Sequence, residues 1–262
     1  MTEPKILSSR DGAIGGITIN NPQRHNAVSN EMWLAIAAAA EALDADPAVR
    51  VVVLRGAGGR AFVSGADISR MEGDRAQGAA VTRAGGPFAS ACAAVNAVTK
   101  PTVAVIQGWC LGGGMGLALS CDLRICTEES RFGIPAAKLS IGYSIDGLRR
   151  IVEVAGFAAA KEIIYTARQY SAAEALRMGL VNRVLAAAEF DAFARDYIEG
   201  IAAGAPLTQL AAKATLAELA KDEAQRDWTR ANALTAQCGS SADHAEGTRA
   251  FMEKRKPVFT GR

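Results

Sequence analysis

Two glycine-rich segments carry residues whose types and spacing could stabilise negative charge on a carbonyl oxygen. Residues 56–68 read Gly-Ala-Gly-Gly-Arg-Ala-Phe-Val-Ser-Gly-Ala-Asp-Ile, and residues 106–122 contain the triple glycine Gly112 to Gly114 before an apolar stretch. Each resembles a strand followed by a tight turn and a helix start, where backbone N–H groups lack intrahelical acceptors. Two such groups aimed at one point form an oxyanion hole, in which each donor contributes about 2.7–4 kcal/mol. Taken alone, either segment also fits an ordinary tight turn with close helix–strand packing.

Other sites for phosphate, acyl or metal chemistry do not fit the sequence. The Gly-x-Gly-x-x-Gly motif of a dinucleotide-binding loop is absent, because Gly112 and Gly114 are followed by Leu117 instead of a third glycine. The Gly-Lys pair of a phosphate-binding loop and the Gly-x-Ser-x-Gly nucleophile motif are also absent. The five cysteines form no Cys-x-x-Cys pair, and the two histidines, His25 and His244, lie far apart in the chain. We therefore expect no metal site, no bound cofactor, and reduced, mostly buried thiols.

Short apolar strands and alanine-rich helices must position the two segments. Residues 13–20, 50–56, 101–107 and 122–127 are predicted strands, and the second is continuously apolar, which is typical of a strand covered on both faces. Ser29 is a candidate cap for a helix whose apolar side includes Met32, Leu34, Ile36 and Leu43. Strands separated by helices predict an α/β fold with mainly parallel connections.

The character of the chain changes after about Asn182, where strand signals stop. Four helices are predicted beyond that point, at residues 189–203, 207–220, 222–238 and 242–255. We therefore divide the chain into an α/β core, residues 1–188, and a helical region, residues 189–262. Such a region could cover the site in its own chain or pack on neighbouring subunits.

Composition narrows the functional classes. Half of the 262 residues are hydrophobic and the formal net charge is +2, so no strong field favours nucleic acid or an anionic membrane. The first residues hold no apolar run long enough for a signal peptide or a membrane span. We expect a cytoplasmic protein with neither a nucleic-acid nor a membrane partner.

Four segments in order resemble the enoyl-CoA hydratase/isomerase (crotonase) superfamily, and the resemblance runs nearly the length of the chain. They are residues 21–27 (Asn-Pro-Gln-Arg-His-Asn-Ala), 64–68 (Ser-Gly-Ala-Asp-Ile), 103–123 around the triple glycine, and 251–259 (Phe-Met-Glu-Lys-Arg-Lys-Pro-Val-Phe). The resemblance implies a ββα superhelix core, a C-terminal helical trimerisation region, and a homotrimer or hexamer. It also implies an acyl-CoA or enoyl-CoA substrate in fatty-acid or related acyl-CoA metabolism.

The same resemblance implies roles for individual residues. The backbone N–H groups of Ala66 and Gly113 would bind the thioester oxygen. The pantetheine and adenine of CoA would contact Arg24, Ser64, Asp67 and Ile68. A neighbouring subunit could contribute Phe251 and Lys254. Simpler interpretations remain open: Asp67 as a helix cap or first-turn residue, Arg24 as a solvated charge, and Phe251 as a core residue.

The chain departs from the family where protons are transferred. Efficient hydratases of the family have two glutamates at the positions occupied here by Gly116 and Ala136. Each well-placed acid or base contributes about 10²–10⁴-fold, so we expect ordinary hydration to be slow. Tyr143 and Asp146 are the candidate substitutes, although Tyr143 could instead be a pocket wall and Asp146 the N-cap of a helix beginning near Leu148.

Two further functions stay open. The stretch 132–176 is similar to the methylmalonyl-CoA decarboxylase branch, which has a tyrosine at the place of Tyr143 and lacks the two glutamates. That branch has a histidine where this chain has Ala66. The other alternative is a non-catalytic, oligomeric CoA-binding protein. We favour an acyl-CoA enzyme of the hydratase/isomerase type that stabilises a thioester enolate.

Overall fold

A six-stranded sheet forms the centre of the chain in the computed structural model, which describes residues 4–66 and 86–262. The strand order is β1-β2-β3-β5-β7-β10. Neighbouring strands run parallel except for the antiparallel pair β1 and β2. The strands are β1 (Ile6–Asp11), β2 (Ile14–Ile19), β3 (Val51–Gly56), β5 (Thr102–Ile106), β7 (Leu123–Thr127) and β10 (Arg183–Leu185). The predicted α/β fold with mainly parallel connections is confirmed.

The four predicted strands correspond to β2, β3, β5 and β7, each within one residue of the expected bounds. Two strands of this sheet were not predicted. The edge strand β1 is mostly exposed, so its sequence lacks the apolar signal of a buried strand. The strand β10 is only three residues long and lies beyond Asn182, so the prediction that strands stop there was wrong.

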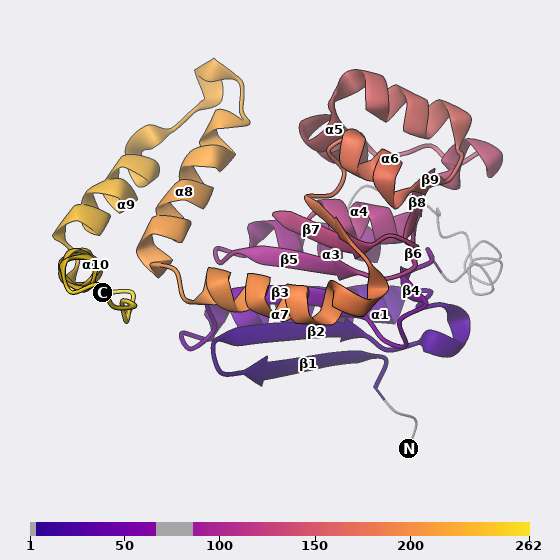
Figure 1. Ribbon diagram of the computed structural model, residues 1–262. Helices are drawn as coiled ribbons and strands as arrows, with labels where there is room; N and C mark the ends of the chain where they lie inside the picture. The colour runs from indigo at the N-terminus through magenta and orange to yellow at the C-terminus, as the bar shows by residue number, and fades with distance from the viewer. Residues whose placement is uncertain (1–3, 67–85) are drawn as a thin grey trace.

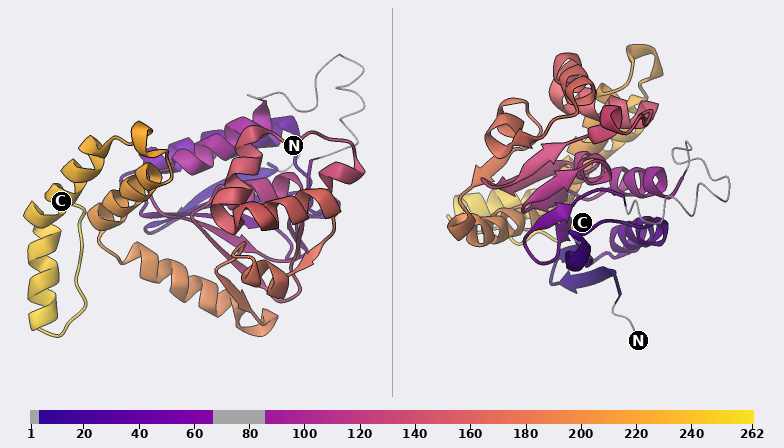
Figure 2. Two further views of the ribbon diagram at one scale, coloured as in Figure 1. Left: turned by 90° about the horizontal axis from the view of Figure 1, so that it is seen from above. Right: turned by 90° about the vertical axis from the view of Figure 1, so that its right-hand side faces the viewer.

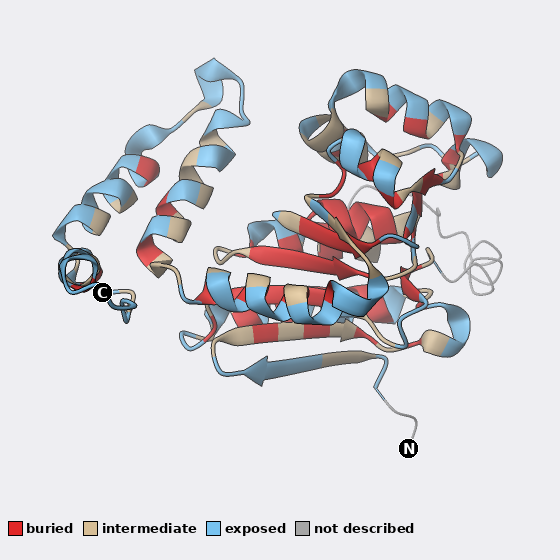
Figure 3. Cartoon of the chain, viewed as in Figure 1, coloured by how far each residue is buried: buried red, intermediate tan, exposed pale blue. Residues whose placement is uncertain are grey.

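Helices cover both faces of this sheet (Figure 2). One face carries α1 (Asn30–Ala45), α3 (Pro87–Ala97) and α4 (Gly113–Leu119), and the other carries α7 (Ala187–Ala202). In β3, Val52 and Leu54 pack in the first cluster, whereas Val51 and Val53 pack against α7. This alternation confirms that the strand is buried on both sides (Figure 3). The contact of Val51 and Val53 with α7 also shows that the first helix of the 189–262 region lies directly on the sheet.

The helix α1 begins as the sequence predicts. The Ser29 hydroxyl accepts a hydrogen bond from the Met32 backbone N–H at 3.4 Å, and Met32, Ile36 and Leu43 are buried. Leu34 is 53% exposed, so its assignment to the apolar side was wrong. It lies two residues from both Met32 and Ile36, about 200° around a helix of 3.6 residues per turn, and therefore faces away from them.

A second, smaller sheet lies beside the first and was not predicted. Its strand order is β4-β6-β8-β9, with β4, β6 and β8 parallel and β9 antiparallel. The strands are β4 (Ala61–Val63), β6 (Trp109–Leu111), β8 (Arg131–Gly133) and β9 (Tyr170–Ser171). Beside it lie the 3-10 helix η2 (Pro135–Lys138), α5 (Ile145–Thr166) and α6 (Ala172–Arg177). Strands of two or three residues are too short for a recognisable apolar pattern.

The last three helices form an arm that extends away from the six-stranded sheet (Figure 1). They are α8 (Pro206–Leu219), α9 (Trp228–Ser240) and α10 (Ala242–Met252), with the short 3-10 helix η3 (Glu223–Gln225) before α9. The Lys213 ammonium on α8 donates to the Asp122 carboxylate at 2.7 Å and to the Lys100 carbonyl at 3.0 Å. These contacts fasten the base of the arm to the loops before β5 and β7.

All five cysteines are free thiols, and four of them are buried, as expected. Across the described ranges, no helix is long and apolar enough to cross a membrane.

Candidate active site

The two glycine-rich segments meet where β4 and β6 end. The two strands pair in parallel, so Ser64 to Ala66 and Gly112 leave the same edge of the small sheet. Gly112 has φ 53° and ψ −117°, a conformation that favours glycine. A Cβ atom at Gly112 would lie only 3.9 Å from the Gly65 Cα atom. Gly65 and Gly112, the residues that precede the two expected donors Ala66 and Gly113, therefore lie close together.

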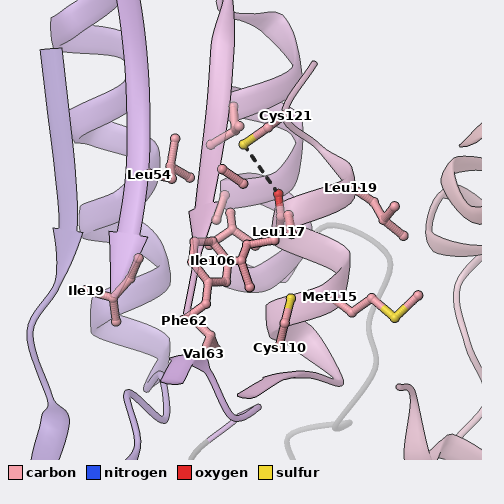
Figure 4. Close-up of a cluster of buried hydrophobic side chains, with 14 of the residues drawn as sticks. Ile19, Leu54, Phe62, Val63, Ile106, Cys110, Met115, Leu117, Leu119 and Cys121 are labelled. Carbon is pink, nitrogen blue, oxygen red and sulfur yellow. Dashed lines mark hydrogen bonds between the residues drawn. The ribbon is translucent and has the colours of Figure 1, made fainter. Parts of the chain in front are cut away.

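The start of α4 is held against β4 because Gly114 has no side chain. A Cβ atom at this position would collide with the Val63 carbonyl oxygen. Beyond it, Met115, Leu117 and Leu119 anchor the helix in the apolar cluster (Figure 4). Gly113 is the first residue of α4, so its N–H has no acceptor within the helix. A ligand oxygen at this helix start would meet partial positive charge.

Ala66 is placed by the loop that precedes α1. It forms an isolated parallel bridge with Val28, whose N–H donates to the Gly65 carbonyl at 3.0 Å. Ala66 itself is exposed. The segment that carries the first expected donor is thus fixed to the core at Gly65, while Ala66 remains accessible.

The expected CoA contacts Arg24 and Ser64 are brought together. The Ser64 N–H donates to the His25 carbonyl at 3.1 Å, and the Ser64 hydroxyl lies 3.5 Å from the Arg24 carbonyl. Arg24 is exposed at the end of the 3-10 helix η1 (Pro22–Arg24). Asp67 and Ile68, the other two residues expected on this side, lie outside the described residues.

A buried asparagine organises that loop. The Asn26 side-chain oxygen accepts from the Asn21 N–H at 2.9 Å, and its amide nitrogen donates to the carbonyls of Ala57 and Ala61 at 2.9 and 2.6 Å. Asn26 has φ 56°, a region that asparagine tolerates better than most residues. This side chain therefore ties the 21–27 segment to the turn between β3 and β4.

Aromatic rings stand over Gly116, one turn after Gly113 on α4. A Cβ atom at Gly116 would lie 2.7 Å from the Phe88 Cζ atom and 3.3 Å from the Tyr143 hydroxyl. A Cβ atom at Gly113 would lie 3.1 Å from Trp33 Cζ2 and 3.5 Å from Phe88 Cε2. The space that a glutamate side chain at position 116 would need is thus occupied by Phe88 and bordered by Tyr143.

The Tyr143 hydroxyl is buried and has no hydrogen-bond partner within residues 4–66 and 86–262. Burial raises the pKa of Tyr143, and the nearby thiols Cys92 and Cys110 raise it further. The phenol therefore stays protonated at neutral pH. A neutral, buried hydroxyl beside Gly116 can donate a hydrogen bond to a ligand atom, and it cannot act as a base at that pH.

Asp146 and Ala136 do not have the features of a buried proton-transferring group. Asp146 is exposed in the first turn of α5. The N-cap of that helix is Ser144, whose hydroxyl accepts from the Gly147 N–H at 3.2 Å, so both the Asp146 cap and the start near Leu148 were wrong. Ala136 is buried within η2 and carries no ionisable group.

Phe251 and Lys254 lie on the other side of the molecule from this site. In Figure 1, α10 is at the far left, whereas β4 and β6 are at the right. Phe251 is 82% exposed, so the interpretation of this residue as part of the core was wrong. The structure therefore does not bring these two residues to the site of their own chain.

Sequence reasoning missed Trp33 and Phe88. Pro87 is a helix-start signal that could have located α3, since proline is favoured at the first helical position. No local pattern, however, indicates that the next residue faces Gly113 and Gly116 across the fold. No group of three or more metal-ligating side chains occurs within the described ranges.

The family model for enoyl-CoA hydratase/isomerase matches residues 9–262 of this chain. The chain belongs to the enoyl-CoA hydratase/isomerase family. A probable enoyl-CoA hydratase of Mycobacterium bovis is 35% identical over all of both chains. A crotonyl-CoA hydratase of Syntrophomonas wolfei is 33% identical and covers 99% of each chain.

Solved structures agree with this family and with the crotonase-like fold. A crystal structure of an enoyl-CoA hydratase/carnithine racemase from Magnetospirillum magneticum has a TM-score of 0.91 and 37% identity, covering 100% of this chain and 97% of that one. A putative family member from Hyphomonas neptunium has a TM-score of 0.90 and 33% identity, covering 99% and 98%. The mixed α/β architecture with its parallel sheet is thus that of the crotonase superfamily.

Proposed function

We propose that this family member binds an acyl-CoA thioester and stabilises its enolate with the backbone N–H groups of Ala66 and Gly113. The observation that supports the proposal is the close approach of Gly65 and Gly112, the residues just before the two donors. An enolate places negative charge on the thioester oxygen, and fixed N–H groups stabilise that charge without reorganising. The expected roles of Arg24 and Ser64 in holding CoA agree with their position beside Ala66.

Ordinary hydration of an enoyl-CoA is expected to be slow. Water must lose a proton to a base and the α-carbon must gain one, and neither Gly116 nor Ala136 can do either. The family resemblance of the sequence implies a glutamate at each of these two positions, and this chain has Gly116 and Ala136 there. Fatty-acid or related acyl-CoA metabolism is the setting that this chemistry favours.

A pair of substitutions at Gly113 tests the oxyanion hole. Gly113→Pro removes the N–H, whereas Gly113→Ala keeps it, and both add a Cβ atom that meets Trp33 at 3.1 Å. The substrate is first found by incubating the protein with saturated, unsaturated and malonyl-type CoA esters and identifying products by mass spectrometry. Turnover of that substrate should fall about 10²–10³-fold more in the proline variant than in the alanine variant. Equal turnover in the two variants would exclude Gly113 as a donor.

A second candidate function is decarboxylation of a malonyl-type CoA ester, and the unpartnered Tyr143 hydroxyl favours it. Breaking the bond between the α-carbon and the carboxylate releases carbon dioxide and leaves its electron pair in the enolate, so no base is needed; a proton from water at the α-carbon then gives the saturated thioester. A neutral tyrosine could hold the carboxylate by a hydrogen bond. The alanine at position 66 removes the histidine expected in that branch. Release of carbon dioxide from methylmalonyl-CoA, with propionyl-CoA as product, would decide for this function.

The assembly we propose is a homotrimer, alone or paired as a hexamer, in which Phe251 and Lys254 reach the CoA of a neighbouring subunit. Supporting this are the exposed apolar side chains on the arm and the segment that follows it, namely Leu216, Leu219, Phe251, Met252 and Val258. If CoA esters bind but no ester is turned over, the chain is a CoA-binding oligomer without catalytic activity.

A further inference from the structure

Phe88 lies along the face of α4 that contains both Gly113 and Gly116. Its ring atoms come within 3.5 Å of a Cβ position at Gly113 and within 2.7 Å of one at Gly116. Residues three apart share a helix face, so one ring spans a full turn of α4 beside the expected donor. Phe88 is only partly buried, in contrast to Trp33, which is buried. Its tip faces two glycines that offer it no side chain to pack against.

The orientation of the ring is fixed by its surroundings. Trp33 contacts it edge to face, with ring centroids 5.0 Å apart and an interplanar angle of 70°. Such aromatic pairs contribute about 0.5–1.5 kcal/mol beyond their buried area. Phe88 also follows Pro87 at the start of α3, whose Ala91, Cys92 and Val95 are buried. Trp33 and the buried side of α3 therefore hold the ring as a wall beside α4.

An acyl chain held at Gly113 must pass this wall. The Phe88 ring already covers the backbone between Gly113 and Gly116, a rise of about 4.5 Å. An acyl chain whose thioester oxygen is bound at the Gly113 N–H therefore cannot extend along this face of α4, and the Tyr143 hydroxyl borders the same face at Gly116.

We propose that Phe88 is a specificity-determining residue that limits the acyl group to a short chain. This inference rests on the proposed binding of an acyl-CoA thioester at Gly113. Phe88 does no chemistry in this role; it determines which thioesters fit. A purely structural role would give a different result, because removing the ring would then lower stability without changing the preference for chain length.

The test measures the dissociation constants of butyryl-CoA and octanoyl-CoA by titration calorimetry on the full chain. The wild type should bind butyryl-CoA more tightly than octanoyl-CoA. Phe88→Ala should shift the ratio of the two constants toward octanoyl-CoA by about tenfold, since each newly accommodated methylene favours binding. Phe157→Ala, which removes a 72% exposed phenylalanine from α5, should leave the ratio unchanged.

Phe88→Leu provides a second variant that keeps an apolar side chain and should give a smaller shift in the same direction. The inference is overturned if the wild type binds octanoyl-CoA as tightly as butyryl-CoA, or if neither Phe88 variant moves the ratio. If the wild type binds no CoA ester, the proposed function itself fails. If esters bind with an unchanged ratio in the variants, only the role of Phe88 fails.

Discussion

Gly116 and Phe88 show how one residue can restrict what another position accepts. A Cβ atom at Gly116 would lie 2.7 Å from Phe88 Cζ, closer than carbon atoms pack. The ring cannot easily retreat because it lies against Trp33. Position 116, where the family resemblance implies a glutamate, therefore has no room for one beside this ring.

The first prediction is that the effect of Gly116→Ala on stability changes sign when the Phe88 ring is removed. Gly116→Ala should destabilise the wild type by about 1–3 kcal/mol through overpacking against Phe88. In a Phe88→Ala background the same substitution should stabilise the protein by up to about 1 kcal/mol, because alanine favours a helix over glycine. Urea unfolding of the four proteins gives the coupling energy. Additive effects at the two sites would show that the ring and the backbone are not in contact.

The second prediction is that Tyr143 and Asp146 contribute differently to turnover. Tyr143→Phe should lower kcat on the best substrate while CoA affinity changes little, as expected for a group used in the transition state. Asp146→Asn should leave kcat nearly unchanged, because this carboxylate is exposed at the start of α5. Burial favours the neutral phenol and raises the pKa of Tyr143, so the active form persists as pH rises through 10. A loss of wild-type activity near pH 10 that disappears in Tyr143→Phe would contradict this.

At the scale of single elements, α4 matters most because Gly113 begins it. A buried guanidinium lies at its C-terminal end: Arg124 donates to the carbonyls of Ala118 in the helix, Cys121 just after it and Leu180, at 3.4, 2.6 and 2.8 Å. A cation at a helix C-terminus is also favoured by the helix dipole. Burial lowers the pKa of Arg124, with the neighbouring Cys121 and Asp122 opposing that shift.

The third prediction follows from this cap. Arg124→Met keeps much of the apolar stem but removes the guanidinium that donates to the Cys121 and Leu180 carbonyls, so it should cost about 2–4 kcal/mol of unfolding free energy. Arg183→Met is the matched control, because Arg183 is exposed and its guanidinium donates to the adjacent Asn182 carbonyl. That variant should stay within about 0.5 kcal/mol of wild type in the same urea titration. Equal stability of the two variants would exclude the capping role.

The elements also show which parts of the fold could be predicted. β3 and β5 are continuous apolar runs between helices, and such runs are visible in the sequence because burial on both faces leaves no polar position. The small sheet could not be predicted from the sequence, because strands such as β4 have only three residues. The start of α5 was misplaced because Ser144 and Asp146 are both good caps, and the choice depends on side-chain geometry.

The candidate site was predictable to the extent that it is made of backbone. The three glycines Gly112 to Gly114 predict a turn and a helix start, and the structure places Gly112 beside Gly65. Side chains that arrive from distant elements gave no such signal. Phe88 and Tyr143 meet at Gly116 only because α3 and the loop before α5 pack on the same helix.

At the scale of the whole molecule, the arm sets the fourth prediction. Its exposed Leu216, Leu219 and Met252 are the apolar side chains that the proposed assembly would cover. Light scattering at micromolar concentration should report a trimer or a hexamer. Met252→Glu should weaken that assembly, whereas Glu253→Gln, a change at an exposed neighbour, should not. A monomeric wild type would contradict the proposed assembly.

The contact between Phe88 and Gly116 also constrains the order in which descendants of this chain could change. A mutation that introduces glutamate at position 116 while Phe88 is still present would destabilise the fold, and selection would remove it for that reason. A smaller residue at position 88 must come earlier, and by the inference above that step alone would broaden the range of acyl chains. A route from this chain to a protein with glutamate at position 116 would therefore pass through an intermediate that accepts a wider range of acyl chains.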